Sequence, residues 1–339
     1  MIFYHSKKSL CHDTENFFRH GAIIPNPENT ARYISLRDAI LSAGHPLQEA
    51  PDQGRAPLAA VHEPAYLDFL AGAWERRAEI DPAAVELLPT QFAKPQMQRR
   101  PEGLRALLGF YAADTSTPIR AGTWDAAYAS AQVALAAADA AGETGAAYAL
   151  CRPPGHHAYA DCAGGFCYLN NTAIAAHRLR QRFDRPVAIL DIDVHHGNGT
   201  QGIFYRRGDV LTVSIHADPS NYFPFYAGYA EQVGEGEGAG CNLNLPLPHG
   251  SGDPVYLAAV ARGIERVRSF QPAALVVALG LDASEHDALG VLKVTRAGFA
   301  EAGRLIAALG LPTALVQEGG YAGRPLQEDL LAFLDGFGR

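Results

Sequence analysis

The sequence lacks three features that would assign it to a class at once: an excess of basic residues, a set of paired cysteines and a long apolar run. The formal net charge of the 339 residues is −8, which leaves no basic footprint for binding DNA or RNA. No run reaches the length of about 18 apolar residues that a membrane helix requires, and the N-terminus lacks the apolar region of a signal peptide. We therefore expect a soluble protein with no nucleic-acid or membrane partner.

The five cysteines are odd in number, scattered along the chain and without a Cys-x-x-Cys pair. This pattern argues against a disulfide framework. We interpret the cysteines as reduced thiols, which predicts a cytoplasmic location.

Apolar residues are abundant. They make up 48% of the chain, enough for a sizeable core in one large α/β domain or two smaller ones. Short apolar runs predict strands that are buried on both faces, at residues 146–150, 187–190, 210–215, 274–279 and 313–316. Helical stretches alternate with them, at residues 124–141, 171–183, 253–270 and 295–309. This alternation predicts a mainly parallel central sheet with helices on both faces.

The first of these helices is rich in alanine, the best helix former. We expect Thr123 to be its N-cap and Gly142 to end it. Before it, residues 79–120 hold several prolines and mixed charge, which predicts a long loop or insertion. Such loops are often functional, although a surface excursion without a role is the alternative.

Polar residues with catalytic or metal-binding side chains follow every expected strand, at residues 152–157, 191–199, 216, 280–282 and 318–321. In open α/β sheets, ligands bind just beyond the carboxyl ends of the strands. These five segments are therefore expected to meet at one crevice.

A metal site is the first interpretation of these residues. Asp191, Asp193 and His195 alternate along an extended segment and so project to the same side. Asp282 is the best candidate for a further ligand, and three protein ligands leave the open position of a catalytic zinc. An isolated Asp-x-Asp is more often a cap or a loop carboxylate, but the addition of His195 and Asp282 favours a metal.

Proton transfer is the second interpretation. His156 and His157 follow a constrained Pro-Pro-Gly turn, and one of them could take a proton from a water molecule. Asp191 is a plausible partner for His156, and Asn198 for His157. Tyr321 follows two glycines and could donate to an oxyanion. The alternatives are solvated turn histidines and an ordinary core tyrosine.

Taken together, the motifs resemble the histone deacetylase superfamily, which includes the bacterial acetylpolyamine amidohydrolases. They are Arg-Pro-Pro-Gly-His-His at 152–157, Gly-Gly-Phe-Cys-Tyr-Leu-Asn-Asn at 164–171, Asp-Ile-Asp-Val-His-His-Gly-Asn-Gly-Thr-Gln at 191–201 and Glu-Gly-Gly-Tyr at 318–321. The resemblance covers nearly the whole chain, and the motifs stand in family order. It implies an arginase–deacetylase α/β fold and a single deacetylase domain over residues 1–339, with the insertion at about 79–120.

The resemblance also implies roles for individual residues. Zinc, or alternatively ferrous iron, would be held by Asp193, His195 and Asp282. His157 would act as general base and acid, His156 as its electrostatic partner, and Tyr321 as the hydrogen-bond donor to the substrate carbonyl. A structural potassium ion would be held by Asp191, Asp193, His195, Ser214 and Ile215.

For the substrate, the resemblance implies a narrow channel lined by Gly165, Phe166 and Phe223, although ordinary packing is the alternative for the two phenylalanines. Glu15 and Asp114 are expected near the distal amine. The sequence departs from the family at two places. Some members carry a carboxylate where Asn198 stands. Polyamine-type members have acidic residues in the long loop, at positions that Arg105 and Ser116 occupy here.

The leading prediction is a homodimeric enzyme that deacetylates a small acylated amine of the acetylpolyamine type. A deacetylase of acetyl-lysine in proteins is its main rival. A manganese hydrolase of the arginase type and a non-catalytic acylamine-binding protein are less favoured.

Overall fold

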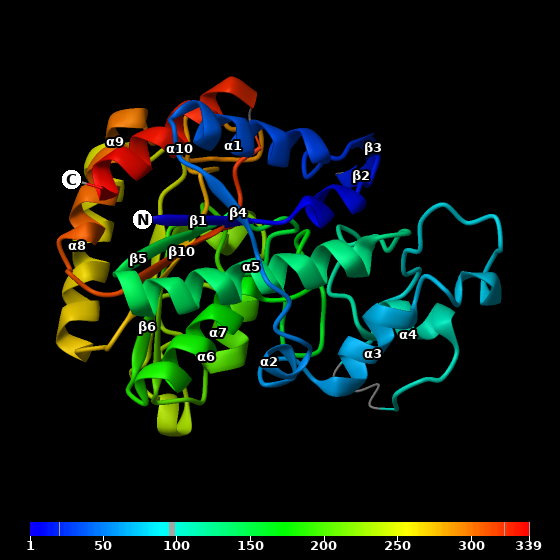
Figure 1. Cartoon of the computed structure of the whole chain (residues 1–339). Helices are drawn as coiled ribbons and strands as arrows, with labels where there is room; N and C mark the ends of the chain where they lie inside the picture. The colour runs from blue at the N-terminus through cyan, green and yellow to red at the C-terminus, as the bar shows by residue number, and fades with distance from the viewer. Residues whose placement is uncertain (20, 95–98, 322, 339) are drawn as a thin grey trace.

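A sheet of eight parallel strands forms the centre of the molecule (Figure 1). The computed structural model describes residues 1–19, 21–94, 99–321 and 323–338. The strand order is β4-β1-β5-β10-β9-β6-β7-β8. In chain order these strands are β1 (Ile2–His5), β4 (Leu47–Glu49), β5 (Ala146–Ala149), β6 (Val187–Asp191), β7 (Val210–Ala217), β8 (Asn242–Leu247), β9 (Leu275–Leu279) and β10 (Thr313–Gln317).

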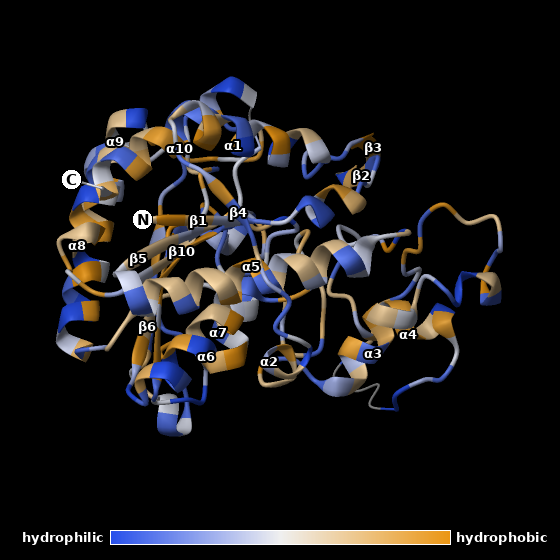
Figure 2. Ribbon diagram, viewed as in Figure 1, coloured by the Kyte–Doolittle hydropathy of each residue, from blue (hydrophilic) through white to orange (hydrophobic). Residues whose placement is uncertain are grey.

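Helices cover both faces of this sheet. On one face lie α5 (Thr123–Thr144) and α6 (Asn171–Phe183), and on the other α1 (Thr30–Ser42), α8 (Asp253–Phe270), α9 (Arg296–Ala307) and α10 (Gly323–Phe337). The buried hydrophobic residues form two cores. Successive residues of β6 pack into them alternately, since Val187 and Ile189 belong to one core and Ala188 and Leu190 to the other. In Figure 2, hydrophobic residues predominate along β6, while α8 and α9 carry both hydrophobic and hydrophilic stretches. The α/β fold class expected from the sequence is confirmed.

The interior strands and several helices agree closely with the sequence prediction. The helices at 171–183 and 253–270 have the expected bounds. The sequence did not reveal β1, β4 or β8. Strands β4 and β8 are the edges of the sheet, and β1 lies next to β4. Only three residues make up β4, and β8 carries two asparagines and a proline, so neither reads as an apolar run.

Both expected ends of the alanine-rich helix were wrong. Its N-cap is Gly122, with a φ of 81°, and Thr123 is the first helical residue. The helix continues through Gly142 to Thr144 and ends before Gly145. The Arg182 side chain lies against the helix at Gly142, where a Cβ atom would be 2.5 Å from its Nε.

The segment at 79–120 is more ordered than a loop. It contains α4 (Leu104–Phe110) and an isolated antiparallel bridge between Leu87 and Ile119. Leu104, Leu107 and Leu108 are buried in one of the two cores. Residues 95–98 of this segment lie outside the described residues.

The remaining short elements lie around this frame. They are α2 (Ala56–Ala59), α3 (Pro64–Gly72), α7 (Asn198–Phe204), the 3₁₀ turns Lys7–Cys11, Arg77–Glu79, Pro219–Asn221 and Gly236–Gly238, and the hairpin of β2 (Asn16–Arg19) and β3 (Ala22–Pro25). Among the described residues, no helix combines the length and apolar character needed to span a membrane.

Candidate metal and catalytic site

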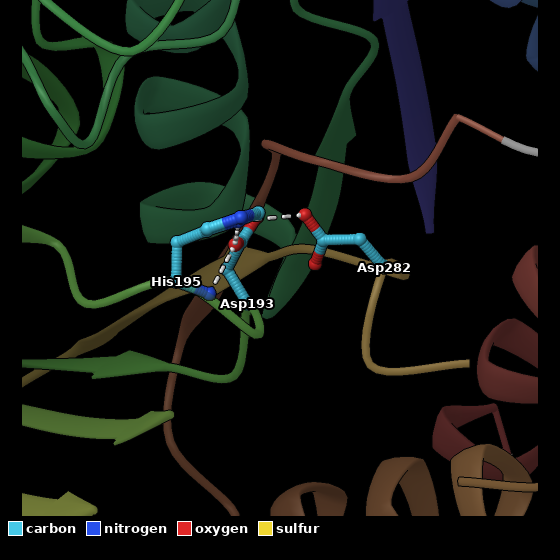
Figure 3. A group of neighbouring side chains, drawn as sticks. All are labelled: Asp193, His195 and Asp282. Carbon is cyan, nitrogen blue, oxygen red and sulfur yellow. Dashed lines mark hydrogen bonds and ion pairs between the residues drawn. The ribbon is translucent and has the colours of Figure 1, made fainter. Parts of the chain in front are cut away.

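The three expected zinc ligands meet at the carboxyl ends of two neighbouring strands. Asp193 and His195 follow β6, and Asp282 follows β9. These strands pair in parallel, with Asp191 opposite Ala278, so the segments after them begin side by side. Figure 3 shows the side chains of Asp193, His195 and Asp282 pointing toward one another.

The ligand atoms of this triad lie close enough together to share one ion. One atom from each of Asp193, His195 and Asp282 lies within 4.8 Å of the other two. Nδ1 of His195 is 3.1 Å from Oδ2 of Asp282 and 3.2 Å from Oδ1 of Asp193 (Figure 3). One imidazole and two carboxylates are a donor set suited to zinc or ferrous iron, so the residues present fit the metal that the sequence predicts.

Neighbouring backbone groups hold the two carboxylates in place. The N–H of Val194 donates to Oδ1 of Asp282 at 3.0 Å, and the N–H of Gly319 donates to Oδ2 of Asp193 at 2.8 Å. A Cβ atom at Gly319 would lie 2.2 Å from Oδ2 of Asp282 and 2.5 Å from Oδ2 of Asp193. At Gly280 it would lie 2.1 Å from Oδ2 of Asp193. Glycine at both positions is therefore required by the carboxylate positions, a role that the sequence alone did not suggest.

The electrostatics of the triad also favour a cation. Asp193 and Asp282 are fully buried. Burial, and then the charge of Asp193, raise the pKa of Asp282 to about 7. Burial lowers the pKa of His195, but its contacts with the two carboxylates outweigh this and raise it to about 9. The two buried carboxylates each place an oxygen within 3.2 Å of the same imidazole nitrogen. Such a pair needs positive charge between its members, which a proton or a metal ion can supply.

The histidine pair lies beside the triad, and each ring has the partner expected for it. Nδ1 of His156 is 2.9 Å from Oδ2 of Asp191, and Nδ1 of His157 is 2.7 Å from Oδ1 of Asn198. Despite burial, the charges of Asp191 and Asp193 raise the pKa of His156 to about 10. Burial, and then the charge of His156, lower the pKa of His157 well below its ordinary value. The two pKa shifts run in opposite directions, favouring the charged form of His156 and the neutral form of His157.

Glu318 anchors the turn that carries these histidines. Its Oε2 accepts hydrogen bonds from the N–H groups of Gly155 at 2.6 Å and His156 at 3.0 Å, and its Oε1 accepts one from Thr172 at 2.6 Å. The sequence marked Glu318 only as part of a motif, without this role. The Glu318 carboxylate therefore links the end of β10 to the turn after β5.

Tyr321 is held from two sides. Its N–H donates to Oδ2 of Asp287 at 2.7 Å, and the Arg32 guanidinium lies 5.3 Å from the centre of its ring. Nε of Arg32 also donates to the carbonyl of Gly320 at 2.7 Å. Burial raises the pKa of Tyr321 well above its ordinary value, so the phenol keeps its proton for donation. Neither Arg32 nor Asp287 stood out in the sequence.

Aromatic rings border this group of polar residues. The ring centres of Phe223 and His157 are 4.9 Å apart, and those of Phe166 and Tyr321 are 5.7 Å apart. Phe166 has a φ of 67°, which is unusual for a residue with a side chain. Gly165 before it packs on His157, since a Cβ atom there would lie 2.3 Å from Cδ2 of that ring.

The two acidic residues expected near the distal amine have different surroundings. Asp114 accepts hydrogen bonds from the N–H groups of Gly165 at 2.9 Å and Ser116 at 2.7 Å, so its carboxylate holds the segment that carries Phe166. Glu15 is exposed and pairs with Arg120 at 3.3 Å. Arg105, also considered for this region, is exposed on α4.

The residues expected at a potassium site are also neighbours. Asp191 pairs with Ser214 in the register between β6 and β7, and Ile215 follows Ser214 on β7. Oγ of Ser214 lies 2.8 Å from Nδ1 of His216. Asp191 links this group to the metal triad, since its Oδ1 accepts the N–H of Asp193 at 3.1 Å.

A parallel sheet with an Asp-His-Asp triad, a histidine pair and a tyrosine at its carboxyl edge defines an α/β protein with a group of side chains that could hold a metal ion. Comparison with known proteins gives the family. Residues 26–337 match the histone deacetylase domain, and the chain belongs to that family.

Two named relatives align with most or all of this chain. The chain is 46% identical, over 345 aligned positions, to the acetylpolyamine amidohydrolase of Burkholderia pseudomallei, with 100% of this chain and 98% of the relative covered. It is 46% identical to acetylpolyamine amidohydrolase 1 of Pseudomonas aeruginosa, with 84% of each chain covered. The crystal structure of the acetylpolyamine aminohydrolase from Burkholderia pseudomallei superimposes with a TM-score of 0.96 at 44% identity, covering 100% of this chain and 99% of that one. The family resemblance found in the motifs is confirmed.

Proposed function

We propose that this chain is a zinc-dependent amidohydrolase that removes the acetyl group from a small acetylated amine, with acetylpolyamines as its substrates. The observation that carries the proposal is the convergence of Asp193, His195 and Asp282 beside His157, with Tyr321 near enough that, beyond its burial, the charges of the two carboxylates raise its pKa. The full-length similarity to acetylpolyamine amidohydrolases supports the choice of substrate.

The chain's own residues would divide the chemistry between them. A zinc ion on Asp193, His195 and Asp282 would supply Lewis acidity toward the amide carbonyl and lower the pKa of water. With its Nδ1 proton bonded to Asn198, His157 keeps Nε2 free to accept a proton from the attacking water. The Tyr321 hydroxyl donates to the oxyanion that forms on the carbonyl oxygen. The proton held on Nε2 of His157 then goes to the leaving amine.

The substrate is threaded between aromatic side chains in this proposal. Gly165, Phe166 and Phe223 line the channel for the acyl-amine chain, and their proximity to His157 and Tyr321 supports this role. Glu15 attracts the distal ammonium group at the exposed end. Asp114 contributes through the Gly165–Phe166 segment that it holds.

Four further features belong to the proposal. Ferrous iron is the alternative metal for the triad, and a structural potassium ion is bound at Asp191, Asp193, His195, Ser214 and Ile215. The protein works as a homodimer, supported by exposed apolar side chains on the hairpin and the nearby insertion, at Phe18, Ile23, Val85 and Leu88. Its location is cytoplasmic, in keeping with five free thiols.

A turnover panel on the zinc-loaded protein tests the proposal. It compares acetylputrescine, acetylspermidine, acetyl-lysine peptides and a simple aryl acetamide. We expect the highest kcat/KM for the acetylpolyamines. A preference for acetyl-lysine peptides would instead favour the protein deacetylase, and cleavage of none of these compounds would reject acetyl removal as the activity.

A further inference from the structure

The residue that orients His157 has a second partner on its far side. Oδ1 of Asn198 is 2.7 Å from Nδ1 of His157, and Nδ2 of Asn198 donates to the Tyr159 hydroxyl at 3.1 Å. His157, Asn198 and Tyr159 thus form a continuous hydrogen-bonded line that runs away from the metal triad. Tyr159 belongs to none of the motifs that identified the site, so no sequence pattern predicted this contact.

Helix α7 sets the position of Asn198 relative to Tyr159, because it carries Asn198 and also the glycine on which Tyr159 packs. Asn198 is its first residue, and Gly202 lies one turn further along. The Tyr159 ring lies against Gly202 so closely that a Cβ atom there would be 2.5 Å from Cδ1 and Cε1 of the ring. The N–H of Tyr159 donates to the carbonyl of Cys162 at 2.9 Å, which holds the backbone. The hydroxyl position is therefore determined by packing and not by the amide alone.

This contact lies at the edge of an open hollow. Tyr159 and Asn198 line a cavity of about 580 Å³ together with Gln201, Tyr205 and Gln232. Asn198 itself is only 8% exposed, and Nδ2 of its amide bonds to Tyr159 at the edge of that cavity. Without the phenol hydroxyl, water would be the partner of Nδ2.

The identity of the partner matters because an amide has an acceptor at one end and a donor at the other. With Oδ1 toward His157, Nδ1 of the imidazole carries the proton and Nε2 can accept one. A half-turn of the amide would present N–H to Nδ1 and force the proton onto Nε2, the tautomer that cannot act as a base. A hydrogen bond from Nδ2 also polarises the amide, which strengthens Oδ1 as an acceptor.

We propose that Tyr159 is a positioning residue for the hydrolytic step, because its hydroxyl, fixed by the packing of the ring on Gly202, accepts Nδ2–H of Asn198 and holds the amide in place with its oxygen on Nδ1–H of His157. The neutral Asn198 supports an imidazolium less well than the carboxylate of some relatives would. Tyr159 offsets part of this difference by polarising the amide. This inference rests on the proposed function, since it acts on the step in which His157 takes a proton.

A double-mutant cycle on the zinc-loaded full chain tests the inference. Tyr159→Phe removes the hydroxyl and keeps the ring on Gly202. We expect kcat for acetylputrescine to fall about fivefold, because the loss of one neutral hydrogen bond has an effect of that size. KM should stay unchanged within about twofold. In the Asn198→Ala background, Tyr159→Phe should change kcat by less than about twofold, because its route to His157 is already cut.

Tyr205→Phe is the matched control, since Tyr205 lines the same cavity and its hydroxyl has no hydrogen-bond partner among the described residues. We expect it to match the wild type. The inference is overturned if Tyr159→Phe also matches the wild type, or if it lowers kcat equally in both backgrounds, as a purely packing role would. Absence of turnover in the wild-type protein would instead reject the proposed function, so the two failures are distinguishable.

Discussion

Oδ2 of Asp282 lies 3.1 Å from Nδ1 of His195, although the two residues are 87 positions apart in the chain. The pairing of β6 with β9 creates this proximity, and the glycines at 280 and 319 leave room for it. We predict that Asp282→Asn lowers zinc content to less than about a tenth of the wild-type value and removes turnover with it, because an amide is a far weaker metal ligand.

Metal analysis after dialysis, alongside acetate release, checks this prediction. Asp125→Asn is the matched control, because Asp125 is exposed in the first turn of α5, away from the triad. Stoichiometric zinc in Asp282→Asn would remove Asp282 from the ligand set.

Tyr321→Phe should separate metal binding from catalysis. The substitution removes only the hydroxyl and keeps the ring contacts with Arg32 and Phe166. We expect zinc content to stay at the wild-type level while kcat falls about 100-fold, the usual effect of losing one oxyanion donor. Steady-state kinetics with parallel metal analysis measure both. Unchanged turnover in this variant would show that the phenol does not take part.

Zinc affinity should depend on pH, since protons compete for the same ligand atoms. The metal-free protein holds the pKa of Asp282 at about 7 and that of His195 at about 9, both above their ordinary values. Protons therefore occupy these ligands increasingly as the pH falls, and affinity should rise from pH 6 to pH 9. Competition with a chelator of known affinity, at constant ionic strength, measures the slope. A flat profile would contradict the raised pKa values.

Asp114 should influence the site through the backbone that it holds. Asp114→Ala removes the acceptor for the N–H groups of Gly165 and Ser116, which releases the strained turn at Phe166. We expect kcat/KM to fall about tenfold, since two hydrogen bonds are lost, while zinc content stays unchanged. Kinetics with acetylputrescine and with an uncharged aryl acetamide separate two roles. Equal losses for both substrates support positioning of Phe166, whereas a loss confined to acetylputrescine would indicate direct contact with the amine.

The sequence predicted the interior of the fold better than its edges. Buried strands such as Val187–Asp191 are continuous apolar runs because both faces are covered, and such runs are visible in a sequence. The short β4 and the mixed β8 have no such pattern. Gly142 shows the limit of propensity rules, since it was expected to end α5 and instead admits Arg182 to the helix surface.

For the site, the motifs pointed to residues that would perform chemistry but not to those that hold them. His157 and Tyr321 stood out because histidine and tyrosine after strands are informative in themselves. Arg32 did not, because its partner, the carbonyl of Gly320, is 288 positions away and any residue could supply a carbonyl. Tyr159 was missed for a related reason, since its role depends on how α7 packs against the turn after His157.

We infer that the centre formed by Asp193, His195 and Asp282 carries out amide hydrolysis with one bound metal ion. Titrating the metal-free protein with zinc, while acetate release from acetylputrescine is measured, tests it most directly. We predict that the rate rises linearly and levels off at one zinc ion per chain. A rate independent of zinc, or no release at any zinc level, would contradict hydrolysis at this metal centre.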